Sequence, residues 1–114
     1  MLTINRTVAI IKPKRPYIKW ANSLPDADRE YTDEVFQKDQ RVLLIPEHDT
    51  PKEDRAYINT IWREIFDEEL LGWSLNRSWW PKERTQKMFW QWFDVEFHSM
   101  VVDMCDTPIE TEEL

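Results

Sequence analysis

The stretch from Trp79 to Met104 constrains the fold more than any other part of the chain, because it concentrates the large apolar side chains. It holds four of the seven Trp, three of the five Phe and three of the four Met residues. A buried aromatic ring removes about 150–250 Å² from water, which at roughly 25 cal/mol per Å² is worth at most about 4–6 kcal/mol. We therefore expect this stretch to form the slab on which the rest of the chain packs.

Two secondary structures compete within this stretch. Met88, Phe89, Trp92 and Phe93 follow the spacing of one helical face, in a helix that opens at Pro81 or at Thr85. Beyond Phe93 the apolar stripe either continues as helix or becomes a strand over residues 95–104. We favour helix to about Phe93 and then strand, because this segment is rich in Val and two earlier strands need a third partner.

Those two earlier strands are short apolar runs, each followed by a proline. Thr7–Ile11 reads TVAII and Val42–Ile45 reads VLLI, and Pro13 and Pro46 end them. Both runs are apolar at odd and at even positions, which predicts strands that are covered on both faces. Between them we expect a short helix over residues 16–21, followed by a polar surface connection with one helical turn from about residue 32.

The clearest helix in the sequence begins after the second strand. Thr50, Pro51 and Glu53 form a capping box with proline at the first helical position, and the helix is predicted to run to about Leu71. Gly72, the only glycine, is expected to end it in the left-handed conformation.

The order of these elements, β-α-β-α-α-β, predicts a small α/β (or α+β) domain over residues 1–106, followed by an acidic tail over residues 107–114. No hairpin signal joins any two strands, and both connections between strands are long. We therefore expect a three-stranded sheet that is at least partly parallel and packed on helices.

Charge is unevenly distributed along the chain. The formal net charge is −7, yet the first 25 residues contain five basic and no acidic side chains, so the remaining 89 residues carry −12. We expect the basic segment to pair with the acidic body, and a body of −12 disfavours nucleic acid as a partner. A single cysteine, Cys105, and the absence of an apolar targeting or membrane segment predict a cytoplasmic protein.

Four blocks of the sequence carry a resemblance. They are VAIIKPKRPYIKWANSLPD, VLLIPEHD, REIFDEELLGW and MFWQWFDVEFHSMVVDM, which together cover roughly half of the chain. With these blocks the chain resembles a family of small, acidic, uncharacterised bacterial proteins. The resemblance implies no activity, cofactor or catalytic residue.

Parallel pairing of the first two strands would bring two polar loops to one edge of the sheet, where open α/β sheets bind ligands. His48 would then be an acid or base beside cations that hold an anionic substrate, with an aromatic ring as a stacking surface. A salt-bridged rim between the loops is the competing and favoured interpretation. The residues concerned are Lys12, Lys14, Arg15, Tyr17, Trp20, Glu47, His48 and Asp49.

Two further groups are weaker candidates. Asp94, Glu96 and His98 share one face if they lie on a strand, where they could ligate a metal or do acid–base work. Polar alternation on a half-exposed strand explains them better. Trp79 and Trp80 are adjacent, so one of them could be exposed for a partner, although packing over helix ends explains them equally well.

The absence of any catalytic motif leads us to expect a non-enzymatic interaction domain that binds a protein partner or itself, without a cofactor. The alternative is a small ligand-binding domain or acid–base enzyme acting on an anionic substrate at the shared strand edge.

Overall fold

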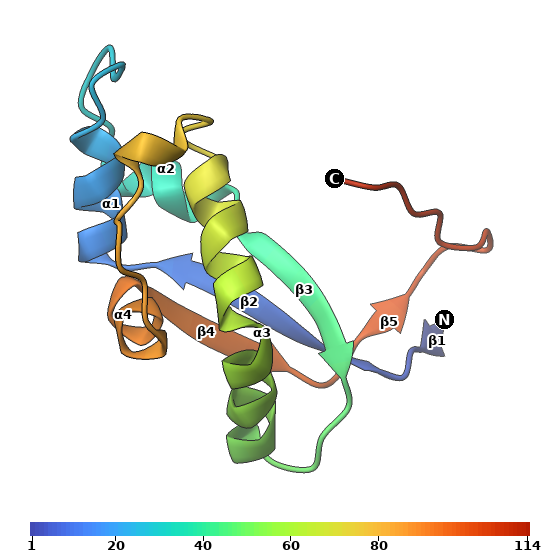
Figure 1. Cartoon of the computed structure of the whole chain (residues 1–114). Coiled ribbons are helices and arrows are strands. Elements are labelled where there is room, and N and C mark those ends of the chain that lie inside the picture. The colour runs from blue at the N-terminus through green and yellow to red at the C-terminus, as the bar shows by residue number, and fades with distance from the viewer.

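A three-stranded antiparallel sheet forms the centre of the computed structural model, which describes all 114 residues. Its strands are β2 (Arg6–Pro13), β3 (Arg41–Pro46) and β4 (Phe93–His98), with β2 in the middle. Two short strands, β1 (Leu2–Thr3) and β5 (Val102–Asp103), form a separate antiparallel ribbon. This ribbon projects from one end of the sheet, together with the C-terminal tail (Figure 1).

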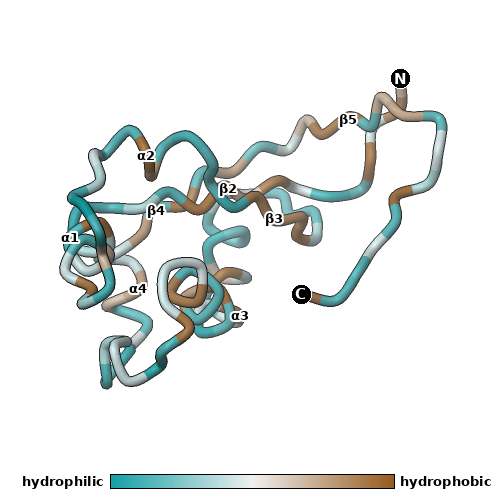
Figure 2. The backbone as a smooth tube through the Cα atoms, turned by 90° about the horizontal axis from the view of Figure 1, so that it is seen from above, coloured by the Kyte–Doolittle hydropathy of each residue, from teal (hydrophilic) through white to brown (hydrophobic).

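The larger helices gather on one face of the sheet. They are α1 (Arg15–Asn22), α3 (Pro51–Leu71) and α4 (Gln86–Trp92), and Figure 2 shows all three on the same side of the strands. The shorter α2 (Asp33–Lys38) joins α1 to β3, and a single 3-10 turn, η1 (Arg77–Trp79), lies between α3 and α4. None of these helices is both long and apolar enough to cross a membrane.

The predicted α/β class with a partly parallel sheet is wrong, because the fold is α+β and every strand pair is antiparallel. The connection between β2 and β3, through α1 and α2, leaves and returns at the same end of the sheet, where Ile11 pairs with Arg41. The single long helix α3 does carry the chain back along the sheet, so β3 and β4 run in the same direction. However, β2 lies between them, and this crossover therefore creates no parallel pair.

The start of α3 is as predicted, but its end is not. Thr50 Oγ1 accepts a hydrogen bond from the Glu53 N–H at 3.2 Å and donates one to the Glu53 carboxylate at 3.1 Å. Gly72 does follow the last helical residue, yet its φ of −62° and ψ of −22° are right-handed helical values. The helix closes instead through the N–H groups of Trp73 and Ser74, which both donate to the Leu70 carbonyl.

The aromatic part of the predicted slab forms the core, but the strand predicted over residues 95–104 ends at His98, and Met100 and Met104 are exposed. The switch from helix to strand falls at Phe93, and both Phe89 and Phe93 are fully buried. Phe66 of α3 packs against them, with its ring centroid 6.2 Å from that of Phe89 and 5.4 Å from that of Phe93. The inner face of the sheet completes this core with the buried residues Ala9, Ile11, Ile45 and Val95.

Candidate functional site: an open sheet face

The opposite face of the sheet carries no α1, α3 or α4, and of the helices only the short α2 lies toward that side (Figure 2). Strand alternation places every second residue on this side, which we call the outer face. The prediction that the strands are covered on both faces is therefore wrong. The outer face consists of Arg6, Val8, Ile10 and Lys12 of β2, Val42, Leu44 and Pro46 of β3, and Asp94, Glu96 and His98 of β4.

One half of the outer face is apolar. Ile10 lies opposite Val42 and Val8 lies opposite Leu44 in the antiparallel register. Val42 remains 57% exposed and Leu44 51% exposed, although both are large hydrophobic residues in a regular strand. Because VLLI has an apolar residue at each position, burying Leu43 and Ile45 against the helices necessarily turns two other apolar side chains outward.

The other half of the outer face is an ionic row along β4. His98 Nε2 lies 2.8 Å from Glu96 Oε2, and Lys12 Nζ donates to Glu96 Oε1 at 3.4 Å. The hydrogen bond with His98, and then the charge of Lys12, hold the pKa of Glu96 below its usual range. Asp94, Glu96 and His98 thus share a face as predicted, but no three His, Cys, Asp or Glu side chains are grouped closely enough to hold a metal ion.

The β1–β5 ribbon extends the β2–β4 ladder past the end of β3. Val8 pairs with His98, and after an irregular segment the ladder resumes where Thr3 pairs with Val102. No residue before Thr7 or after Val95 is buried. The ribbon and tail instead carry exposed large apolar side chains, which are Met1, Leu2, Met100, Met104, Ile109 and Leu114.

The surface area of the chain is larger than its mass predicts. A folded monomer of 14.0 kDa is expected to expose about 6,700 Å², whereas this chain exposes 8512 Å². The radius of gyration, 15.8 Å, also exceeds the value of about 13 Å expected for a compact domain of this length. The open face, the projecting ribbon and the C-terminal tail, whose residues 104–114 are all exposed, contribute to this large surface.

The predicted site at a shared strand edge does not form. Lys12 lies at the end of β2 that pairs with the start of β4, while Glu47, His48 and Asp49 follow Pro46, which pairs with Arg6 at the other end. At about 3.3 Å per residue, the eight residues of β2 keep the two loops about 26 Å apart.

The cations of the first loop have structural partners instead. Lys14 Nζ donates to the Trp90 carbonyl at 3.1 Å, and Arg15 forms an ion pair with Asp33 at 2.6 Å. These contacts fasten α1 to α4 and to α2. The predicted pairing of the basic segment with the acidic body is met by Arg15 and by Lys12, which pairs with Glu96.

Three of the four aromatic candidates are held by packing and by side-chain hydrogen bonds to main-chain carbonyls, while Trp79 is half-buried. Tyr17 is buried and its hydroxyl donates to the Glu69 carbonyl, while Trp20 Nε1 donates to the Trp79 carbonyl at 3.0 Å. Trp80 is 5% exposed and its Nε1 donates to the Ser74 carbonyl at 2.9 Å. Tyr17 and Trp80 are thus buried and offer no free stacking surface.

His48 has a partner that the sequence analysis missed. Its Nδ1 lies 2.8 Å from a carboxylate oxygen of Asp54, which is 6% exposed in the first turn of α3. A buried carboxylate that orients an imidazole is an arrangement that acid–base enzymes use. The pair connects the loop after β3 to the first turn of α3, and His48 lines none of the five main cavities.

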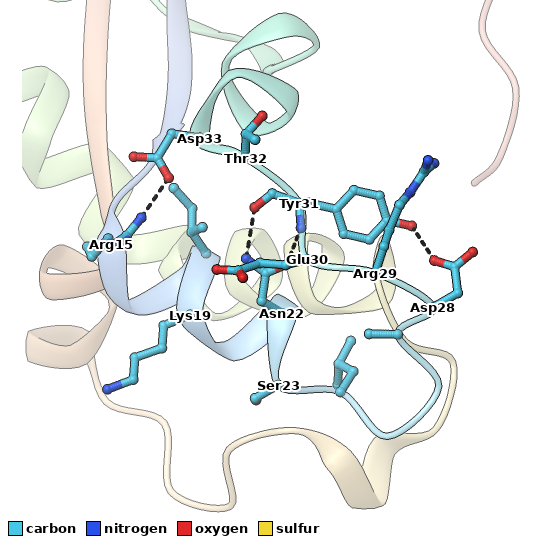
Figure 3. A pocket seen from close by; sticks show the side chains of 13 residues that line it. Arg15, Lys19, Asn22, Ser23, Asp28, Arg29, Glu30, Tyr31, Thr32 and Asp33 are labelled. Atoms are coloured by element: carbon cyan, nitrogen blue, oxygen red, sulfur yellow. Dashed lines mark hydrogen bonds and ion pairs between the residues drawn. The ribbon is translucent and has the colours of Figure 1, made fainter.

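The largest cavity is an open depression of about 1110 Å³ between α1 and the loop that leads to α2. Figure 3 shows that its polar groups bond to one another: Arg15 with Asp33, Tyr31 with Asp28, and the Asn22 amide with both main-chain groups of Tyr31. Three cations and three anions line it, all six of these charged side chains are exposed, and only Arg15 and Asp33 among them form an ion pair. These bonds stabilise the loop.

Comparison with protein-family models, with curated proteins and with solved structures finds no match. The resemblance to small acidic bacterial proteins therefore stays a prediction.

Proposed function

We propose that this protein is a non-enzymatic interaction domain that binds another protein through its outer face. The observation that carries the proposal is the uncovered apolar half formed by Val8, Ile10, Val42 and Leu44. An apolar centre flanked by charged groups is the usual composition of a protein–protein interface. Here the row of Lys12, Glu96 and His98 supplies the charged flank.

The charge of the chain supports a protein partner over a polyanion. At −7 the molecule repels nucleic acid and anionic membranes over about a Debye length of 8–10 Å. The acid–base alternative loses its geometric basis, because His48 and the cations proposed to bind its substrate lie at opposite ends of the sheet.

Site-specific photo-crosslinking tests the proposal. A benzophenone amino acid at position 44 projects from the outer face, whereas the same group at position 60 projects from the exposed side of α3 and is the matched control. In lysate from cells that naturally make the protein, we expect a discrete adduct from position 44 that disappears with Val42→Asp. The proposal fails if position 44 gives no adduct, or if both positions give the same adducts.

A further inference from the structure

We propose that the partner on the outer face is a second copy of this chain, so that two sheets pack outer face to outer face in a two-fold symmetric dimer. This inference rests on the proposed function and specifies its partner. It follows from the amount of surface left uncovered, from the pattern on that surface and from the position of the ribbon.

The uncovered area matches what a stable dimer needs. The chain exposes 8512 Å², about 1,800 Å² more than a monomer of its mass should. A standard interface covers about 800 Å² on each partner, and permanent homodimers cover about 1,000–2,500 Å² on each. Even if the acidic tail accounts for half of the excess, the remainder still equals one side of a standard interface.

The outer face is complementary to itself. A two-fold axis that passes through the apolar half lays Val42 and Leu44 of one copy over the same half of the other. The same rotation carries the two ionic rows along β4 to opposite borders of the contact, where Lys12 and Glu96 stay hydrated. Two aligned sheets packed in this way lie about 10 Å apart, as in a β-sandwich. Each copy would thus gain the second layer that its outer face lacks.

The β1–β5 ribbon favours the same arrangement. An isolated two-stranded ribbon is marginally stable in water, and this ribbon has no helix or third strand of its own chain against it. It projects beyond the end of β3, and the two-fold axis that separates the ionic rows runs along the strands, so the ribbon of the second copy lies at the same end and can pack beside it. Leu2, 74% exposed, and Met100, 85% exposed, are the apolar side chains that this contact would bury.

Salt concentration separates a second copy from a cationic partner. Two chains of −7 repel each other, so salt that screens this repulsion strengthens or preserves the dimer. A basic protein bound to the carboxylates of the ionic row would instead dissociate as the salt concentration increases.

Sedimentation equilibrium of the full chain tests the dimer. We expect a mass of about 28 kDa, twice 14.0 kDa, at micromolar concentration, and no loss of dimer between 0.05 and 0.5 M NaCl. Leu44→Asp places a carboxylate in the interface from each of the two copies, and it should weaken association about 100-fold or more. The matched variant Leu75→Asp changes a residue that is 84% exposed in the connection after α3, and should leave the mass unchanged. Far-ultraviolet circular dichroism of both variants checks that they fold.

A monomer at all concentrations overturns the inference, and so does a folded Leu44→Asp variant that dimerises as well as the wild type. The photo-crosslinking result then shows whether the wider proposal also fails. An adduct at position 44 with a different protein retains the interaction function but rejects the second copy. No adduct at that position rejects both.

Discussion

Arg41→Met should lower stability in a pH-dependent way, because Arg41 is the counterion of a largely buried carboxylate. Arg41 Nε donates to Glu69 Oε1 at 2.8 Å, and the Glu69 side chain is 13% exposed. Arg41 also approaches the Glu68 carbonyl at 3.4 Å, which places a cation at the C-terminal end of α3. No basic residue lies in the last turn of this helix, so β3 supplies the charge that the helix itself lacks.

Burial raises the pKa of Glu69 above its ordinary value of 4.5, and Arg41 partly offsets this increase. A carboxyl whose pKa is raised by folding contributes stability that is fully present below pH 4.5 and is lost as the pH rises through the raised pKa. Without Arg41 the pKa rises further, so the loss at neutral pH becomes larger. Breaking a buried ion pair costs about 3–5 kcal/mol, and since Arg41 is 31% exposed we expect about 2 kcal/mol at pH 7.

Urea denaturation followed by Trp fluorescence at fixed protein concentration measures this cost. The destabilisation by Arg41→Met should fall to about 1 kcal/mol or less at pH 4, where Glu69 is protonated in both states. Glu69→Gln is the matched control, because it keeps the shape of the side chain without its charge. Adding Glu69→Gln to Arg41→Met should remove most of the pH dependence. An equal cost of Arg41→Met at pH 4 and pH 7 would refute this reasoning.

Two further substitutions test the fold. Gly72→Ala should stabilise the protein by about 0.4–1 kcal/mol in urea denaturation, since Gly72 has right-handed helical angles and an added Cβ would lie 3.4 Å from the Glu69 carbonyl oxygen; a loss of stability would support the left-handed cap that the sequence predicts. Phe66→Ala should cost about 3–5 kcal/mol by removing a fully buried ring from the aromatic cluster, whereas Leu75→Ala should change stability by less than about 0.5 kcal/mol. Similar effects of these last two variants on the urea midpoint would contradict the assigned core.

Local signals in the sequence located most of the elements. The capping box at Thr50 placed the start of α3, and the helical spacing of Phe89 and Phe93 identified core residues. Proline after each apolar run marked the ends of β2 and β3 to within a few residues. These features were predictable because each depends on residues that are close together in the chain.

The pairing of strands was not predictable in the same way. A connection that holds two helices returns to the same end of the sheet or crosses to the other end according to how those helices pack, since both connections here hold two. The second helix of the first connection, α2, has only Val35 and Phe36 as large apolar residues, and its sequence resembles a surface loop. That short helix reverses the chain, which separates His48 from Lys14 and removes the predicted ligand site.

The open outer face could not be predicted from the same apolar runs that located the strands. A run that is apolar at every position predicts two buried faces, and this rule applies to an assembly as well as to a single chain. If the second copy covers Val42 and Leu44, the prediction from the sequence describes the dimer, while the single chain shows only one layer of it.

The most direct measurement of the central claim is the solvent exposure of methyl groups, read by NMR with a soluble paramagnetic probe at a concentration where the chain is associated. The account predicts that the methyl signals of Val42 and Leu44, which are 57% and 51% exposed in a single chain, are protected almost as well as those of fully buried Ile58. The methyl signals of Leu75, 84% exposed, should broaden strongly. Equal broadening of Val42, Leu44 and Leu75 would contradict the claim that the outer face is an interface.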